Sequence, residues 1–228
     1  MATTSHRLHF DQELHDLQDN LLRMASLVDS AIAHALQALG DQDLDLARQI
    51  AIEDARINEI RFKIEEQCLL LIAREQPVAT DLRAIVAALN IAGEIERMGD
   101  HAAGIAKTVL RMGVQAPIMP LIDLNRMADE SRSMLRTALD ACVKRDSELA
   151  QSVAWRDDVI DGLYQDVFRQ IVGLIADDPA ITTRAMYLLF AGHNLERIGD
   201  RCVNIAERVI FINSGTMKEL SAGPDEHL

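Results

Sequence analysis

Apolar residues recur every three or four positions along most of the chain, which is the period of one face of an α-helix. One such stripe consists of Ile91, Ile95, Met98, Ala102, Ile105 and Val109. A second stripe consists of Ala191, Leu195, Ile198, Cys202, Ile205 and Val209. The pattern predicts long amphipathic helices that pack side by side, with Cys202 in their core. The single aromatic residues Trp155 and Phe168 are also expected to pack.

Glycine, proline and aspartate residues indicate where these helices begin and end. The boundary residues are Gly40, Asp41 or Asp43, Pro77, Gly113, Asp146, Asp178 and Pro179. We expect a first helix over residues 10–39, a second ending near residue 75, a third ending near 112, and three more ending near 144, 176 and 213. Helices of about thirty residues are about 45 Å long, and short connections make consecutive helices antiparallel.

The second half of the chain repeats the first. An offset of 103 aligns Asp54 with Asp157, and it still holds where residues 71–73 align with 174–176. The offset falls to 102 at Pro77 and Pro179, and to 100 where residues 96–100 align with 196–200. The sequence therefore predicts an all-α protein of six long helices, arranged as two tandem antiparallel three-helix bundles. We place these bundles at residues 1–114 and 115–215, followed by a flexible polar tail at 216–228.

Composition restricts the classes of partner. The formal net charge is −13, which disfavours binding to nucleic acid or to anionic membranes, because proteins that bind these need clustered Lys and Arg. An acidic chain instead suits cations or basic protein surfaces. Three separated cysteines, no apolar leader in residues 1–11 and no run of about eighteen uncharged apolar residues predict a cytoplasmic protein without membrane insertion.

Acidic residues recur at matching positions of the two copies. Glu96 and Asp100 lie four apart on the third helix, roughly opposite its apolar stripe, and Glu196 and Asp200 repeat them on the sixth. Residues of the second and fifth helices accompany them: Asp54 and Asn58 in the first copy, Asp157 and Asp161 in the second. The small residues Gly93, Gly99, Ala103 and Gly104 are expected to leave the face around Glu96 bare.

Carboxylates that converge from neighbouring helices are suitable ligands for a hard or borderline cation. The alternative is a solvated acidic face, because Arg97 and Arg197 each follow a glutamate. Glu-x-x-His pairs, a Gly-rich phosphate loop and a nucleophile elbow do not occur in the sequence, which argues against an enzyme. His34, His101 and His193 leave phosphotransfer open as a minor alternative.

Three segments resemble the PhoU family of bacterial phosphate-uptake regulators. They are Gln76–Arg83, Glu96–Asp100 and Leu195–Ile205, and they stand in the family's order in a chain that is similar over nearly its whole length. The resemblance implies paired three-helix bundles, assembly as a homodimer and a non-enzymatic role in repressing the phosphate-starvation response. It also implies two partners, which are the ATPase subunit of the phosphate ABC importer and a phosphate-responsive sensor histidine kinase.

The resemblance further implies multinuclear iron or zinc on the acidic motifs. Carried over to this sequence, the ligands are Glu96, Asp100, Glu196, Asp200, Asp157, Asp161 and Asp54. The first copy departs from the pattern, because Asn58 stands where the second has Asp161, and Gly104 where it has Asn204. We therefore expect tighter metal binding in the second copy. A metal-dependent enzyme or metal store using the same carboxylates, and an inert scaffold, remain the competing interpretations.

Overall fold

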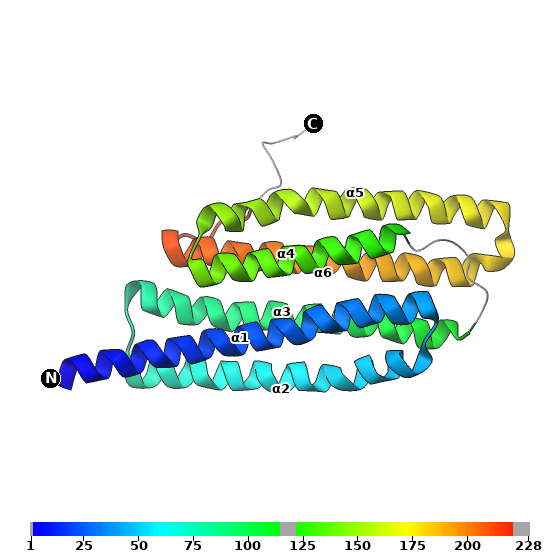
Figure 1. The fold of residues 1–228 in the computed structure, drawn as a ribbon. Helices are drawn as coiled ribbons and strands as arrows, with labels where there is room; N and C mark the ends of the chain where they lie inside the picture. The colour runs from blue at the N-terminus through cyan, green and yellow to red at the C-terminus, as the bar shows by residue number, and fades with distance from the viewer. Residues whose placement is uncertain (1, 115–121, 221–228) are drawn as a thin grey trace.

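The computed structural model describes residues 2–114 and 122–220, and within these ranges it contains helices and no strand. The helices are α1 (Ala2–Asp41), α2 (Leu44–Glu75), α3 (Ala79–Met112), α4 (Ile122–Lys144), α5 (Ser147–Asp177), a short 3-10 turn η1 (Pro179–Ile181) and α6 (Thr182–Ser214). Figure 1 shows α1, α2 and α3 as one antiparallel bundle and α4, α5 and α6 as a second beside it. This confirms the predicted fold.

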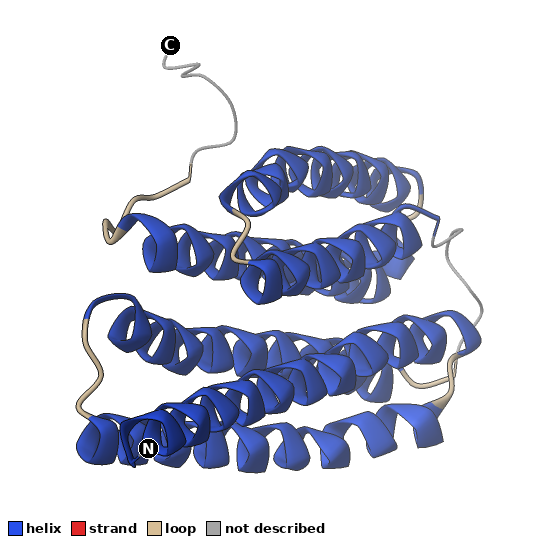
Figure 2. Ribbon diagram, turned by 60° about the vertical axis from the view of Figure 1, so that its left-hand side comes forward, coloured by secondary structure: helices blue, strands red, loops and turns tan. Residues whose placement is uncertain are grey.

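The two bundles meet along α3 and α6, and along α1 and α4 (Figure 2). Buried apolar side chains from all six helices form one continuous hydrophobic cluster. Both predicted stripes lie in it, and the side chain of Cys202 is fully buried, as predicted. Trp155 and Phe168 were predicted to pack, but the structure leaves them 57% and 48% exposed. Their positions on α5 lie outside the sector that faces the core.

Aspartate side chains begin three of the elements. The Asp43 carboxylate accepts hydrogen bonds from the backbone N–H groups of residues 45 and 46, and Asp146 does the same for residues 148 and 149. Asp178 accepts from the N–H of Ala180 and so begins η1. These caps satisfy backbone donors that have no partner within a helix. Asp43, rather than Asp41, is therefore the cap of the second helix.

Other boundaries differ from the prediction. α1 already begins at Ala2 and continues through Gly40, because the left-handed turn that ends it falls on Gln42 (φ 54°). Pro77, which was expected at a helix boundary, lies in the connection between α2 and α3, and α3 begins two residues later at Ala79. The predicted bundle boundary at 114–115 and the tail beyond residue 220 involve residues outside the described ones. Within the described tail, the N–H of Leu220 donates to Glu207.

Structurally equivalent positions face each other between the bundles. Arg132 donates through Nε and Nη2 to the two carboxylate oxygens of Asp29, at 3.0 and 2.9 Å, and these two residues are equivalent under the offset of 103. On α3 and α6, Arg201 lies 3.3 Å from Glu94, and the equivalent pair His101 and Asn194 lies 3.1 Å apart. The bundles are therefore related by an approximate two-fold axis that passes close to Asp29 and Arg132.

No helix in the described part of the chain is both long and apolar enough to cross a membrane.

We predict that Asp29→Ala weakens the contact between the bundles. It removes the acceptor shared by Arg132 and Arg136, and leaves a partly buried guanidinium without its carboxylate. The free energy of unfolding should fall by about 1–2 kcal/mol in urea titrations. Asp19→Ala, at an exposed position of the same helix, is the control for helix propensity. Equal stabilities of the two variants would contradict the prediction.

Candidate functional site

The acidic residues of the second copy lie where α5 packs against α6. A side chain at Gly199 would place its Cβ 2.8 Å from Oδ1 of Asp157 and 2.9 Å from Cδ1 of Ile160. The glycine therefore allows the Asp157 carboxylate to approach the backbone of α6. Oδ1 of Asp157 is buried and makes no hydrogen bond. A buried carboxylate oxygen without a partner is costly and indicates a missing proton or cation.

Burial and mutual repulsion raise the pKa values of this cluster. Burial first, then the charges of Asp161, Asp200 and Glu196, raise the pKa of Asp157 from its ordinary 3.8 to about 7. Burial and the charge of Asp200 also raise the pKa values of Asp161 and Glu196. The carboxylates of Glu196, Asp200, Asp157 and Asp161 thus lie near enough to repel one another.

Arg197 neutralises part of this charge. Its Nη1 donates to Oδ2 of Asp200 at 2.8 Å, and its Nε lies 2.9 Å from Oε2 of Glu196 without hydrogen-bond alignment. Nδ1 of His193 lies 3.5 Å from the same glutamate oxygen, and its ring is tilted by 46° against that of Tyr164, with centroids 6.2 Å apart. Burial and the charge of Arg197 lower the pKa of His193.

The first copy has a related but weaker arrangement. Oδ1 of Asp54 lies 3.4 Å from the Cβ that a side chain at Gly99 would have, and it is also buried without a hydrogen bond. Burial and the charge of Asp100 raise the pKa values of Asp54 and Glu96. Arg61 approaches Glu96 at 3.9 Å. The structure thus brings Asp54, Glu96 and Asp100 together, as expected.

Asp100 is exposed on the side of α3 opposite the apolar stripe, whereas Glu96 is only partly exposed. Their neighbours Gly99 and Ala103 are buried, and the Glu96 side chain is only 20% exposed. The reason is that α3 packs against α1, α2 and α6, so little of its circumference is exposed. Gly99 and Gly104 fit beneath neighbouring helices, whereas a Cβ at Gly93 would meet no atom within 4 Å.

Gly104 and Asn204 belong to the seam between α3 and α6. A Cβ at Gly104 would lie 2.9 Å from Oδ1 of Asn194, and the amide of Asn204 donates to Glu94 at 3.0 Å. Their difference therefore concerns the packing of the two bundles. Glu94, Arg61, Tyr164 and the place of His193 beside Glu196 were not predicted from the sequence. The repeat aligns His193 with Gly93, and this difference between the copies could have drawn attention to His193.

The carboxylate oxygens of each copy are suitable ligands for a cation, but they are not arranged as a complete coordination sphere. Each copy offers a buried, unpartnered carboxylate oxygen and neighbouring carboxylates with raised pKa values. Among the described residues, however, no group of three or more His, Cys, Asp or Glu side chains converges on one point. In the second copy, Arg197 lies against both Glu196 and Asp200, and it would have to release them.

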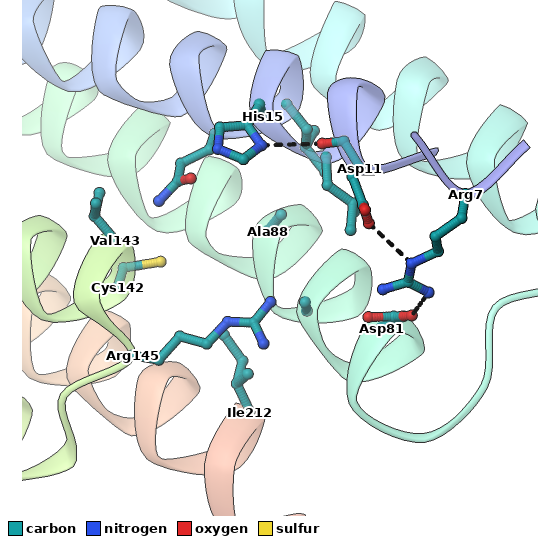
Figure 3. A pocket seen from close by; sticks show the side chains of 13 residues that line it. Arg7, Asp11, His15, Asp81, Ala88, Cys142, Val143, Arg145 and Ile212 are labelled. Carbon is teal, nitrogen blue, oxygen red and sulfur yellow. Dashed lines mark hydrogen bonds and ion pairs between the residues drawn. The ribbon is translucent and has the colours of Figure 1, made fainter. Parts of the chain in front are cut away.

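A separate cavity of about 340 Å³ lies where α1 and α3 meet the ends of α4 and α6 (Figure 3). Arg7 on its wall lies 3.0 Å from Asp11 and 2.8 Å from Asp81. Arg145 and Cys142 also line the cavity. Since two arginines there accompany two aspartates, the cavity is not the basic cluster that binding of free phosphate favours.

Comparison with known proteins identifies close relatives. A family model described as the PhoU domain matches residues 21–109 and 124–209, one match in each copy. The phosphate-specific transport system accessory protein PhoU homolog of Pseudomonas putida is 36% identical over 91% of this chain and 81% of its own length. The homolog of the same name from Clostridium acetobutylicum is 34% identical over 93% of this chain and 97% of its own.

Solved structures of PhoU proteins have the same fold as this chain. The crystal structure of PhoU from Pseudomonas aeruginosa matches with a TM-score of 0.85 and 35% identity, and covers 91% of this chain and 100% of that one. The phosphate transport system regulatory protein PhoU from Streptococcus pneumoniae matches with a TM-score of 0.86 and 34% identity, over 92% and 100%. Both likenesses extend across the two bundles.

We predict that Asp157→Asn changes how stability depends on pH. Because the pKa of Asp157 is about 7 in the folded chain and 3.8 ordinarily, the folded state holds more protons between these values. The wild-type free energy of unfolding therefore falls as pH rises from about 4 to 7. Asp157→Asn should lack this loss and exceed wild type by about 1 kcal/mol at pH 8, after allowance for partial exposure.

The measurement is urea unfolding at pH 5 and pH 8 with a chelator present. Asp177→Asn, at an exposed position of the same helix that does not contribute to the raised pKa of Asp157, is the control and should keep the wild-type pH dependence. If Asp157→Asn and wild type change equally between the two pH values, the carboxyl of Asp157 is not the buried, protonated group inferred above.

Proposed function

Since the chain belongs to the PhoU family, we propose that it is a non-enzymatic negative regulator of the phosphate-starvation response and a modulator of phosphate uptake. The observation that supports this role is similarity at about 35% identity, across both repeats, to proteins named as accessory to phosphate-specific transport.

In this proposal the protein is an adaptor that acts by contact. Its partners are the ATPase subunit of the phosphate ABC importer and the phosphate-responsive sensor histidine kinase. The ATPase subunit of such an importer lies on the cytoplasmic side, so the adaptor works there, as a homodimer. The paired cylinders of the two bundles provide long, rigid helical faces for such contacts (Figure 1). An excess of acidic residues, giving a net charge of −13, favours partners with basic surfaces.

Metal binding is a second part of the proposal. Asp157, Asp161, Glu196 and Asp200 would hold iron or zinc in the second copy. Asp54, Glu96 and Asp100 would provide a weaker site in the first. The unpartnered oxygens of Asp54 and Asp157 and the mutual repulsion of their neighbours support this assignment. A bound cation would supply positive charge where α5 meets α6, and α2 meets α3.

The regulatory proposal predicts the behaviour of a phosphate-starvation reporter in phosphate-rich medium. Deletion of the gene should switch the reporter on, and the wild-type chain should silence it. A variant with alanine at Glu96, Asp100, Glu196 and Asp200 should fail to silence it, although folded and expressed, if the carboxylates serve the function. A reporter that stays silent after deletion would refute the regulatory role and favour the enzyme, metal-store or scaffold alternatives. If the variant silences the reporter as fully as wild type, these four carboxylates are not needed for regulation.

The metal proposal predicts unequal sites. Asp200→Ala should remove more iron or zinc from the purified chain than Asp100→Ala, because the second copy offers four carboxylates and the first has Asn58 in place of one of them. Elemental analysis after equilibration with each metal measures the loss. Asp158→Ala, which changes a neighbouring acidic residue, should retain the wild-type content. Equal losses from Asp100→Ala and Asp200→Ala would overturn the ranking, and wild-type metal content in both would overturn the sites themselves.

A further inference from the structure

The cavity between the two bundles lies away from the acidic clusters. It has a volume of about 340 Å³ and forms where α1 and α3 face the ends of α4 and α6 (Figure 3). This volume is in the range of about 300–1,000 Å³ that is usual for sites of small organic ligands. The acidic residues proposed above as metal ligands do not line it. We call it the inter-bundle cavity.

Apolar side chains from three helices line the inter-bundle cavity. They are Leu14 and Leu17 of α1, Ala84 and Ala88 of α3, and Ile212 of α6. Ala84 and Ala88 lie one turn apart, and their small side chains leave room beside α3. Leu17, Ala88 and Ile212 belong to the buried hydrophobic cluster. A hydrocarbon chain that packs against these side chains is removed from water, which favours the binding of an apolar ligand.

Three charged side chains of the cavity already pair with one another. Arg7 lies 3.0 Å from Asp11 and 2.8 Å from Asp81, so two carboxylates share its guanidinium. Because one arginine faces two aspartates, this triad is negative overall and repels an anionic ligand. An anion in the cavity therefore has to bind away from Arg7.

Arg145 is the other arginine of the cavity. In the described part of the chain its guanidinium forms no ion pair or hydrogen bond, while its backbone N–H donates to the C=O of Cys142 and its C=O accepts from the amide of Asn213. Figure 3 shows the side chains of Arg145 and Cys142 extending into the cavity from the side opposite Arg7. A guanidinium without a carboxylate partner beside an apolar surface is a suitable donor to the carboxylate of a ligand.

The Cys142 thiol lies close enough to be influenced by this guanidinium. Burial raises the pKa of the thiol to about 11, and the charge of Arg145 counteracts part of the rise. The side chains of Cys68 and Cys202, in contrast, are fully buried in the core. The reactivity of Cys142 therefore reports on the space beside Arg145.

The turn that carries Arg145 does not require an arginine. Arg145 has a φ of 52°, and the amide of Asn213 donates to its C=O at 2.7 Å and to Oγ of Ser147 at 2.8 Å. Under the offset of 103, the equivalent residue of the first copy is Gln42, whose φ is 54°. Glutamine is thus compatible with the same left-handed conformation, and the backbone does not explain the guanidinium.

We infer that the inter-bundle cavity binds a monocarboxylate with an unbranched apolar tail, of the kind found in medium-chain fatty acids. The carboxylate accepts hydrogen bonds from the guanidinium of Arg145, and the tail packs against Leu17, Ala88 and Ile212. The negative triad around Arg7 disfavours a dianion, and the volume of the cavity limits the length of the tail.

The apolar tail has to contribute much of the affinity. The chain carries a net charge of −13, which weakens the binding of any anion, so a short carboxylate without a tail is not expected to be held. The inference concerns a site separate from the acidic clusters and stands whether or not the chain regulates phosphate uptake.

The test is isothermal titration calorimetry of the full chain with sodium decanoate, below the concentration at which it forms micelles and with a chelator present. Decylamine and decanol, which have a similar tail and a positive charge or none, test the need for the carboxylate. Hexanoate and palmitate test the length of the tail. The principal variant is Arg145→Gln, which installs the residue of the first copy. The matched control is Arg23→Gln, the same change at an exposed position of α1 outside the cavity.

Wild type and Arg23→Gln should bind one decanoate per chain. Arg145→Gln should bind it about tenfold or more weakly, because a hydrogen bond to a charged group is lost. Ala84→Leu, which fills part of the cavity without a change of charge, should also weaken binding. From hexanoate to decanoate the affinity should rise by up to about fourfold for each added methylene, and palmitate should gain nothing further. Circular dichroism checks that each variant is folded.

Three results of the titrations would overturn the inference. They are equal affinities of Arg145→Gln and Arg23→Gln for decanoate, binding of decylamine as tight as that of decanoate, and an affinity that continues to rise up to palmitate.

Alkylation by N-ethylmaleimide then locates the bound ligand. Decanoate should slow the labelling of Cys142 in proportion to the occupied fraction of the chain, as mass spectrometry of its peptides measures. Cys68 and Cys202 should react slowly with or without decanoate, because they are fully buried. Binding of decanoate that leaves the labelling of Cys142 unchanged would place the ligand outside the cavity and overturn the inference.

Discussion

The seam between α3 and α6 is the contact on which the rest of the structure depends. Each of these helices belongs to one bundle, and each packs its buried stripe into a hydrophobic cluster that continues through both. The polar contacts along the seam come in equivalent pairs, Glu94 with Arg201 and Asn194 with His101. Because the two bundles use the same faces of equivalent helices, the seam fixes their relative placement and leaves α2 and α5 on the outer sides (Figure 1).

The acidic clusters follow from this placement. The inner faces of α3 and α6 pack in the seam and the core. On their outer sides, α2 packs against α3 at Gly99 and α5 packs against α6 at Gly199. Each outer helix places an aspartate, Asp54 or Asp157, next to that glycine. A larger residue at Gly99 or Gly199 would collide with an isoleucine of the neighbouring helix, and at Gly199 it would also collide with Asp157. The same close approach that packs the helices thus also buries a carboxylate oxygen. Packing and electrostatics are inseparable at these two points.

Much of this could be predicted from the sequence, because helical period and repeated motifs are local properties. The offset of 103 identified the duplication, and Asp43 and Asp146 marked helix starts that the structure confirms. How deeply the acidic residues are buried could not be predicted from the sequence. Their burial depends on which side of α3 its three neighbouring helices cover. Arg197 illustrates the limit: its position beside Glu196 was evident, but its contact with Asp200 required coordinates. Likewise, exposure of Phe168 depends on how α5 is rotated against α6.

The ion pair of Asp29 with Arg132 has a consequence for how such a chain can arise. An assembly of two identical halves about a true two-fold axis would place the side chain at this position opposite its own copy. Two aspartates or two arginines would then repel each other, and neither arrangement could form a salt bridge. Fusion of the halves into one polypeptide lets each diverge separately, so that opposite charges now meet on the axis. The halves have become mutually complementary, and neither could replace the other.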